Sequence, residues 1–327
     1  MTSFRINHTA RALAALLLGA CAITSFAQPY PSRTISVVVP FSPGGVSDIT
    51  ARPLAIAMAA NLGQSIIVEN KPGAGGGTGM AYAAKAKPDG YTLMMALPSI
   101  SIIPASEKLA GKPPSFIENQ FIPIARITAD PTLFAVRADA PWKTLDDFIR
   151  DAKKNPGTIS YSTSGIYGTT HAAMEMFAHA ANVKLLHTPY SGGGQQVTAL
   201  VGGHVQATAQ TLAPIAGHIK SGRLRVLAVW SAERIKSMPE VPTLKELGYN
   251  AEFYLWTGLF APPGTPADIV TRLRTSVKEA VSDAEFRKSI TALDTPIQYQ
   301  DSADFKKFWD EDSKRLTEVV NRMGRLE

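Results

Sequence analysis

The sequence ISVVVPFSPGGVSD occupies residues 35–48 and decides the fold class. Four of its first five residues are β-branched, which favours a strand, and the segment that follows is rich in proline and glycine, which favours a loop. Apolar residues then recur at helical spacing over residues 47–61, and Ser47 or Asp48 is the expected N-cap. A strand that passes through a glycine-rich turn into a helix is the repeating unit of an α/β protein.

The same unit recurs along the chain. Strands are expected at residues 65–69 and 91–96, with a helix over 78–87 between them, so this region reads as a parallel βαβαβ unit. A second series follows, with expected strands at 133–136, 159–162, 185–188, 205–210 and 224–230. Helices are expected at 145–154, at 169–182, from the glycines at 192–194 to about residue 201, and at 215–220. The C-terminal part differs, because a helix begins near residue 266 and a long amphipathic helix covers 301–323.

The length of 327 residues fits two domains. Each would be an α/β lobe with a mixed, mostly parallel sheet flanked by helices. We expect the chain to cross between the lobes near Thr128 and Glu252. The first lobe would then comprise residues 28–127 and 253–327, and the second lobe residues 128–252.

Residues 1–27 have the composition of a secretory signal peptide. Arg5 and Arg11 precede an apolar run over 12–23, and Ser25 and Ala27 place small residues before a cleavage site that follows Ala27. The apolar run is too short for a membrane span. An alternative is lipid attachment at Cys21, which ends the lipobox-like sequence LGAC. Export through a cleaved signal predicts a periplasmic protein.

Composition excludes several classes of protein. The net charge is +6 and falls to +4 when Arg5 and Arg11 leave with the signal peptide, and the basic residues are dispersed, so nucleic acid is not an expected partner. The one cysteine lies in the signal segment, which excludes thiol catalysis and cysteine zinc sites in the mature chain. A dinucleotide template begun by Gly73 and Gly75 meets Thr78 at its last glycine, and no cofactor is expected.

Three strand-to-helix loops are candidates for ligand binding: 41–48, 69–79 and 162–171. Glycine lets the backbone approach a ligand closely, and a helix N-terminus offers unpaired N–H groups with a partial positive charge. Such loops bind anions without any basic side chain, and they lie where α/β sheets bind ligands. Four aromatic residues near the loops are candidates to wall a small-molecule pocket: Phe41, Tyr167, Tyr190 and Trp256.

Two other classes of function stay open from the residues alone. His171, Glu175 and His179 recur every fourth residue on one expected helix, a spacing that could bind zinc and would make the protein an exported metal receptor. An exported hydrolase is a weaker alternative, because the chain contains neither G-x-S-x-G nor H-E-x-x-H and no spacing identifies a catalytic triad.

An ordered set of motifs resembles the Bug (TctC-like) family of extracytoplasmic solute receptors. The motifs are VPFSPGGVSD (39–48), ARPLA (51–55), VENKPGAGG (68–76), KPDGYTL (87–93), TPYSG (188–192), VPTLKE (241–246) and APPGTP (261–266), and the similarity covers essentially the whole mature chain. The resemblance implies a periplasmic two-lobe binding protein of type II, a Venus-flytrap fold, rather than an enzyme. It further implies capture of a small carboxylated solute, a mono- or dicarboxylate and possibly an aromatic one, by a monomer without metal or cofactor. Its partners would be a large and a small membrane subunit of a tripartite tricarboxylate transporter.

The resemblance also assigns ligand-binding residues by matching motif. They are Phe41, Ser42, Gly44, Gly45 and Asp48 in the first loop, Ala74, Gly75 and Gly76 in the second, and Ser164, Gly168, Thr169, His171 and Tyr190 in the other lobe. This chain departs from the family where relatives carry Tyr-Lys-Gly and it has Tyr190-Ser-Gly192. It departs again after the glycine turn at 202–203, where relatives carry Asp and it reads Gln206-Ala-Thr208. These departures alter the local charge and leave the solute open.

Overall fold

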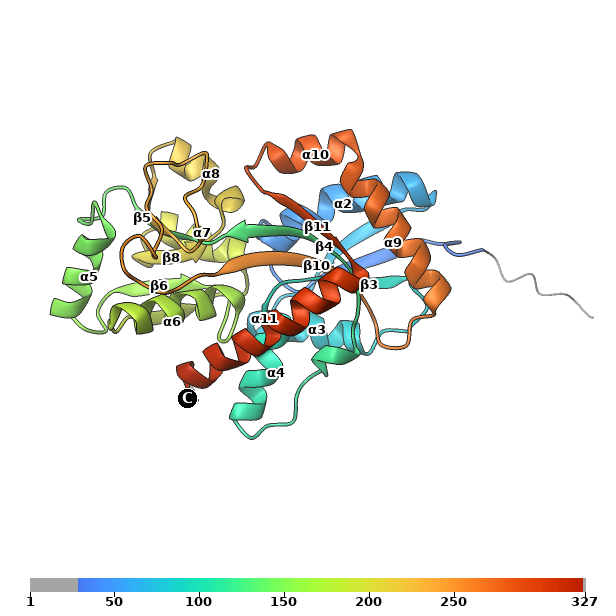
Figure 1. Ribbon diagram of the computed structural model, residues 1–327, viewed down its shortest axis with the longest axis horizontal. Helices are drawn as coiled ribbons and strands as arrows, with labels where there is room; N and C mark the ends of the chain where they lie inside the picture. Colours follow the sequence, from blue (N-terminus) through green and yellow to red (C-terminus); the bar gives the residue numbers. More distant parts are fainter. Residues whose placement is uncertain (1–28, 326–327) are drawn as a thin grey trace, which may run out of the picture.

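The computed structural model describes residues 29–325. The predicted signal peptide, its cleavage site and Cys21 lie outside the described residues. Within them the chain forms two mixed sheets, each flanked by helices, which confirms an α/β fold with two lobes (Figure 1). No helix among residues 29–325 is long and apolar enough to cross a membrane.

The first lobe is built on a six-stranded sheet with the order β11-β4-β10-β3-β1-β2. Strand β1 pairs in parallel with β2 and β3, whereas β10 and β11 pair antiparallel with their neighbours. The strands are β1 (Ile35–Val39), β2 (Ile66–Asn70), β3 (Thr92–Ala96), β4 (Ile122–Pro131), β10 (Tyr254–Ala261) and β11 (Ile297–Asp301). The helices around it are α2 (Val46–Leu62), α3 (Gly77–Ala84), α4 (Ser99–Leu109), α9 (Ala267–Ser282), α10 (Ala284–Thr291) and α11 (Ser302–Met323), with short 3₁₀ turns η1 (Ala74–Gly76) and η2 (Glu118–Gln120).

The second lobe repeats this plan around a five-stranded sheet with the order β7-β6-β8-β5-β9. Strand β6 pairs in parallel with β7 and β8, and β5 pairs antiparallel with β8 and β9. The strands are β5 (Leu133–Arg137), β6 (Ser160–Thr163), β7 (Leu186–Pro189), β8 (Ala207–Gln210) and β9 (Leu224–Val229). The helices are α5 (Leu145–Lys154), α6 (Thr169–Ala181), α7 (Gly193–Val201) and α8 (Leu212–Lys220).

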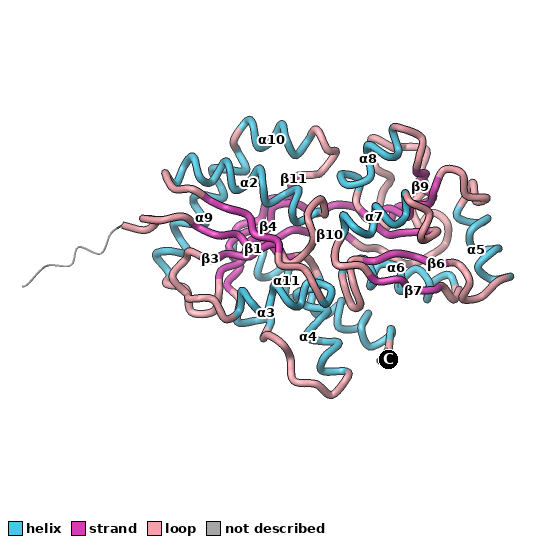
Figure 2. The backbone as a smooth tube through the Cα atoms, turned by 180° about the vertical axis from the view of Figure 1, so that it is seen from behind, coloured by secondary structure: helices cyan, strands magenta, loops and turns pink. Residues whose placement is uncertain are grey.

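Two strands, β4 and β10, lead the chain into and out of the second sheet, as the tube view shows (Figure 2). The crossing segments are joined by backbone hydrogen bonds. Thr132 N–H donates to the Phe253 carbonyl at 3.3 Å, Trp230 N–H donates to the Thr132 carbonyl at 2.8 Å, and Phe253 N–H donates to the Trp230 carbonyl at 2.9 Å. These bonds tie the two crossings into one connection between the sheets, the hinge.

Aromatic rings pack against one another in both lobes, within one hydrophobic cluster that extends through the two. In the first lobe Phe260 packs edge-on against Trp309 with ring centroids 4.9 Å apart, and in the second lobe Phe134 packs against Phe148 at 4.8 Å. Trp256, a candidate pocket wall, lies in the core of the first lobe. It is 1% exposed, its indole N–H donates to Asp312 at 2.8 Å, and its ring packs against other aromatic rings of the first lobe.

A buried carboxyl lies next to the hinge. Asp130 is near the end of β4 and 2% exposed, and its Oδ2 has no hydrogen-bond partner among the described residues. Burial raises the pKa of Asp130 from 3.8 to about 7, against hydrogen bonds from Thr128 and Thr295 that lower it. Between pH 3.8 and about pH 7 the carboxyl of Asp130 therefore keeps its proton in the folded protein and loses it in the unfolded chain. Because the folded state binds more protons there, the free energy of unfolding falls as the pH rises from 4 to 7.

The variant Asp130→Asn should remove this pH dependence. We compare the free energy of unfolding of the variant with that of wild type. The variant's value minus the wild-type value should increase by about 2–3 kcal/mol from pH 5 to pH 8, since a neutral amide has no proton to lose. Urea unfolding of both proteins at the two pH values measures the difference. Glu279→Gln, at an exposed position of α9, is the control and should show no comparable change. A stability gain that is the same at both pH values would contradict the assignment.

Candidate functional site

All three glycine-rich loops follow a strand and lead into a helix. The loop after β1 precedes α2, the loop after β2 precedes α3 through the turn η1, and the loop after β6 precedes α6. The expected N-caps of α2 were wrong. Gly45 is the N-cap, Ser47 Oγ donates to the Met95 carbonyl at 3.1 Å, and Asp48 accepts the N–H of Gly44 at 3.0 Å. The first loop is therefore fixed from inside its own lobe, and no side chain caps the N–H groups at the start of α2.

The second and third loops meet across the two lobes. A Cβ atom built on Gly75 would lie 2.7 Å from the carbonyl oxygen of Ile166 and 3.1 Å from the amide nitrogen of Gly168. A Cβ on Gly165 would lie 2.6 Å from the Gly75 nitrogen. Such distances leave no room for any side chain, so the contact depends on glycine in both lobes. The two loops that were predicted separately thus form one interface.

The first loop meets a turn of the second lobe that the sequence did not identify as part of the site. This turn comprises Ser191–Gly194, and it includes Gly192, which is the N-cap of α7, and the first two residues of that helix. Ser42 N–H donates to the Ser191 carbonyl at 3.3 Å. A Cβ on Gly45 would lie 3.4 Å from Gly193 Cα, so the N-termini of α2 and α7 abut. The run of three glycines at 192–194, immediately before a helix, was the available sequence signal.

The carboxylate of Asp48, in the first turn of α2, is already paired with Arg52, so this arrangement favours a further anion. The N-terminus of a helix carries roughly half a positive charge, and α2 and α7 bring two such ends together. Helices α4 and α6 also bring their N-termini together. The N–H of Ser99, at the start of α4, donates a hydrogen bond of 3.1 Å to Oγ1 of Thr169, at the start of α6. A negatively charged group between the lobes would offset the repulsion and accept hydrogen bonds from the free N–H groups.

Several buried polar atoms near these contacts have no partner among residues 29–325. They are the hydroxyl oxygens of Ser42, Ser99 and Thr211 and the amide nitrogen Nε2 of Gln210, and their residues are at most 5% exposed. Buried polar groups are nearly always hydrogen-bonded, so an unpaired set indicates a missing partner such as a ligand or water. Ser42 was predicted from the sequence, whereas Ser99, Gln210 and Thr211 were not. The three missed residues lie at or just after the ends of strands β3 and β8, where α/β sheets bind ligands.

Asp48 already has partners within the first lobe. Its carboxylate accepts hydrogen bonds from Gly44 N–H at 3.0 Å, from Arg52 at 2.7 and 3.0 Å, and from Asn70 at 2.9 Å. Burial alone would raise the pKa of Asp48, but the hydrogen bonds from Arg52, Gly44 and Asn70 outweigh burial and lower it. The ionised carboxylate therefore holds the first loop in place.

His171 is similarly engaged within the second lobe. Its Nδ1 accepts the N–H of Tyr167 at 3.0 Å, and its ring stacks on His187 with centroids 3.8 Å apart. Burial and the neighbouring His187 both lower the pKa of His171, so its imidazole is neutral at pH 7. A neutral ring that accepts from Tyr167 fixes the loop between Gly165 and Gly168.

The remaining predicted residues line the same two interfaces. Phe41 is 2% exposed, and its ring lies against Gly76. Ala74 and Gly75 form η1 with positive φ values of 48° and 64°. Ser164 hydrogen-bonds Thr170 within the second lobe at 3.1 Å. Tyr190 N–H donates to Thr163 at 2.9 Å, next to the turn 191–194.

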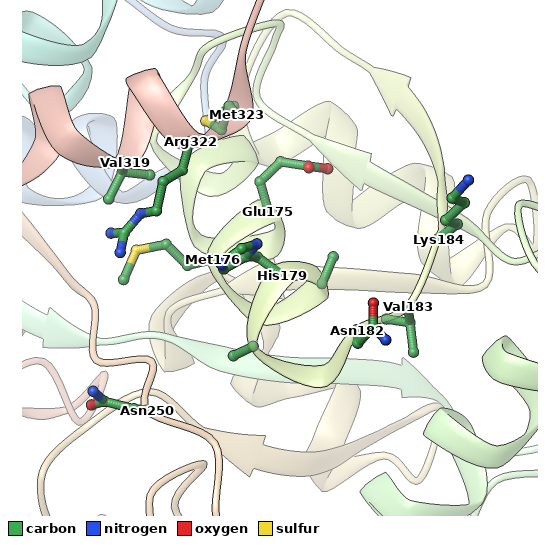
Figure 3. A pocket seen from close by; sticks show the side chains of 12 residues that line it. Glu175, Met176, His179, Asn182, Val183, Lys184, Asn250, Val319, Arg322 and Met323 are labelled. Atoms are coloured by element: carbon green, nitrogen blue, oxygen red, sulfur yellow. The ribbon is translucent and has the colours of Figure 1, made fainter.

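The geometry does not form the zinc site that the spacing of His171, Glu175 and His179 allowed. Among residues 29–325 no group of three or more His, Cys, Asp or Glu side chains is placed to hold a metal ion. Glu175 accepts a hydrogen bond from Tyr161 at 2.5 Å. Glu175 and His179 line a cavity of about 300 Å³ between α6 and the end of α11, where Figure 3 shows them with Arg322 and Met323.

Comparison with known proteins identifies the family. The sequence model described as "Tripartite tricarboxylate transporter family receptor" (TctC) matches residues 50–325. A Cupriavidus necator protein named "UPF0065 protein in gbd 5'region" is 36% identical over 315 residues, which cover 96% of this chain and 95% of the relative.

Two solved structures from Rhodopseudomonas palustris are similar in sequence and fold. The protein MatC (Rpa3494), with bound malate, is 30% identical with a TM-score of 0.81, and the match covers 89% of this chain and 100% of that one. The protein Rpa4515, with adipate, is 28% identical with a TM-score of 0.82, and the match covers 89% of this chain and 97% of that one.

Proposed function

This chain belongs to the TctC family of tripartite tricarboxylate transporter receptors, which are solute-binding proteins and not enzymes, and on this premise we propose that it captures a small carboxylate between its two lobes. The observation that carries the proposal is the meeting of helix N-termini from both lobes around buried polar atoms that have no partner among residues 29–325. A carboxylate supplies both the negative charge and the hydrogen-bond acceptors that this arrangement needs. The adipate and malate bound to the two similar R. palustris proteins support a dicarboxylate.

The proposed mechanism is closure of the lobes. The first lobe would comprise residues 28–127 and 253–327, and the second lobe residues 128–252. The hinge would be formed by the two crossing segments that pair with each other. A ligand that contacts both lobes binds the closed state more tightly than the open one, and that difference in affinity is what shifts the equilibrium. The glycine contacts of Gly75 with 165–168 and of Gly45 with Gly193 are contacts between lobes, so they exist only when the lobes are closed.

The proposed ligand-binding residues have two roles. The first role is contact with the ligand. Backbone N–H groups and hydroxyls would come from Ser42, Gly44, Gly45, Ala74, Gly75, Gly76, Ser164, Gly168 and Thr169. Phe41 and Tyr190 would form apolar walls. Asp48 and His171 would position the loops, since their polar atoms are engaged in their own lobes. The receptor would be exported to the periplasm as a monomer and deliver its solute to two membrane subunits.

A thermal-shift panel tests the function. The protein is first unfolded and refolded to remove any solute that co-purifies, and is then mixed with adipate, succinate, L-malate, benzoate, acetate or zinc chloride. A ligand at 100 times its Kd adds about 2.7 kcal/mol to the free energy of unfolding, so a matching carboxylate should raise the Tm by several degrees.

The panel also separates the alternatives. Stabilisation by zinc that is lost in His171→Ala would favour a metal receptor over a carboxylate receptor. A panel in which every carboxylate leaves the Tm unchanged would contradict the proposed ligand class.

A further inference from the structure

Gln210 is the last residue of β8, and its amide group has a defined orientation. Its Oε1 accepts the N–H of Thr211 at 2.9 Å. Exchanging the amide oxygen and nitrogen would place two donors against each other, so the hydrogen bond fixes which atom is which. The NH₂ group therefore points away from Thr211. It is buried, in a residue 1% exposed, and has no acceptor among residues 29–325.

A second buried glutamine shows what a purely structural role looks like. Gln196 lies in α7 of the same lobe and is 0% exposed. Its Nε2 donates to Thr208 Oγ1 and to the Ala209 carbonyl at 2.6 and 2.5 Å, and its Oε1 accepts from Thr170 at 3.2 Å. Every polar atom of Gln196 is used inside the lobe. Gln210 differs because its donor remains free.

The free donor of Gln210 lies where the two lobes meet. A Cβ atom on Gly193 would lie 2.9 Å from Gln210 Nε2 and 3.2 Å from Gly45 Cα of the other lobe. The missing side chain at Gly193 thus leaves the amide beside the contact between α7 and α2. On the neighbouring residue, a Cβ on Gly192 would lie 2.5 Å from Ser42 Oγ, one of the first-lobe hydroxyls that lack a partner within the described part of the chain.

We propose that Gln210 is a specificity-determining residue, whose amide N–H group donates a hydrogen bond to an oxygen of the bound solute at the contact between α2 and α7. The inference rests on the proposed carboxylate-receptor function. At this contact the Gln210 amide nitrogen and the N–H groups that begin α2 and α7 can only donate hydrogen bonds, whereas the Ser42 hydroxyl can donate or accept. An ammonium group can only donate, so it cannot pair with the Gln210 amide nitrogen or with the helix N–H groups, whereas a carboxylate, hydroxyl or carbonyl oxygen can.

The solute class follows from this chemistry. The end of the solute that faces Gln210 carries an oxygen acceptor and no amino group. A diacid or hydroxy acid satisfies this condition, and an amino acid that places its ammonium group at this contact does not. Hydrogen bonds to charged acceptors are among the stronger ones in proteins, so losing this donor should weaken binding by about 10- to 100-fold.

Two variants of Gln210 test the inference by calorimetry, with whichever of adipate, succinate or L-malate raises the Tm most as the probe. Gln210→Met keeps the length and removes the donor, and it should weaken binding by about 10- to 100-fold at pH 8. Gln210→Glu replaces the donor with a carboxylate that repels the solute, so binding at pH 8 should be weaker still. At pH 5.5 the buried carboxyl takes up a proton and can donate a hydrogen bond. The ratio of the variant's affinity to that of wild type should therefore be at least about ten-fold higher at pH 5.5 than at pH 8.

Gln206 supplies the matched control. Its Oε1 also accepts a backbone N–H, that of Ser160 at 2.9 Å, but it is exposed and precedes β8. Gln206→Met and Gln206→Glu should bind as wild type does at both pH values. Circular dichroism melting checks that each variant folds, and Gln210→Met alone decides the question if Gln210→Glu is unfolded at pH 8.

The outcomes are separable. Wild-type protein whose Tm no carboxylate of the thermal-shift panel raises contradicts the proposed function. Wild-type protein that only benzoate or acetate stabilises overturns the solute class inferred here. Wild-type binding together with Gln210→Met within about two-fold of it overturns the role of Gln210 alone. A Gln210→Glu variant that binds the acid more tightly than wild type at pH 8 overturns it as well.

Discussion

Gly75→Ala should lower the affinity for the bound carboxylate by at least about 100-fold. The added Cβ would lie 2.7 Å from the carbonyl oxygen of Ile166, and real Cβ atoms essentially never approach a backbone atom so closely. Because that oxygen belongs to the other lobe, the lobes cannot close fully, and the ligand loses its contacts with one of them. Calorimetric titration with the acid that stabilises wild type most strongly measures the loss.

Gly63→Ala is the matched control for this prediction. Gly63 has a φ of +68° and Gly75 a φ of +64°, so alanine meets similar backbone strain at both, about 1–2 kcal/mol. Within the part of the chain that the structure describes, no atom beyond its chain neighbours lies within 4 Å of a Cβ built on Gly63. Both variants should therefore lose similar stability in the absence of ligand, and only Gly75→Ala should lose affinity. Equal affinity in the two variants would mean that the contact between Gly75 and Ile166 plays no part in ligand capture.

Asp48→Ala should destabilise the protein by about 3 kcal/mol and weaken ligand binding as well. The side chain is 6% exposed and accepts hydrogen bonds from Arg52, Asn70 and Gly44 N–H. Its removal leaves these donors without their acceptor and releases the first loop, and breaking a buried charged pair costs several times more than breaking an exposed one. Urea unfolding measures the stability, and calorimetry measures the affinity.

A surface ion pair of the same spacing provides the control. Lys306 and Asp310 pair across one turn of α11 at 2.6 Å, and Asp310 is 52% exposed, so Asp310→Ala should cost less than about 1 kcal/mol. The pH dependence adds a second check. The folded-state pKa of Asp48 is lowered, so its stabilisation is present above its ordinary value of 3.8 and is lost as the pH falls through the folded value. An effect of Asp48→Ala as small as that of Asp310→Ala would contradict the role given to Asp48.

Much of the fold could be predicted from local sequence. The strand at 35–39 and the helix at 145–154 were predicted with the bounds they have. The helix is sharply delimited because Thr144 and Asp147 form a capping box, in which each side chain accepts the other residue's N–H, at 3.2 and 2.9 Å. These elements are specified by residues close together in the chain, so their pattern is complete within a short window.

Other elements left no such pattern. Strands β4, β10 and β11 and helices α4 and α10 were not predicted. Strand β4 contains Pro123 and ends at Pro131, and α4 contains Pro104, so proline interrupts the period that would identify each one. The two long crossing strands are stabilised by pairing with each other, over a sequence separation of more than a hundred residues. That stabilisation is invisible in either segment alone.

The candidate site divides in the same way. The glycine-rich loops and their helices follow from the sequence, because glycine and strand-to-helix order are local properties. The family resemblance supplied Ser42 and the loop glycines, yet it grouped Asp48 and His171 with the ligand contacts. The structure shows both engaged inside their own lobes, with Arg52 and Asn70 in one case and with Tyr167 and His187 in the other.

By itself the sequence determined the α/β class, the succession of strand, glycine-rich loop and helix, and the family. Only the tertiary structure decided which loops face each other, that Gly75 meets Ile166 and Gly45 meets Gly193, and that Gln210 has a free donor at that second contact. The physical reason is that secondary structure depends on neighbours in the chain, whereas an unpaired polar atom or a close backbone approach depends on what another lobe brings within a few ångströms of it.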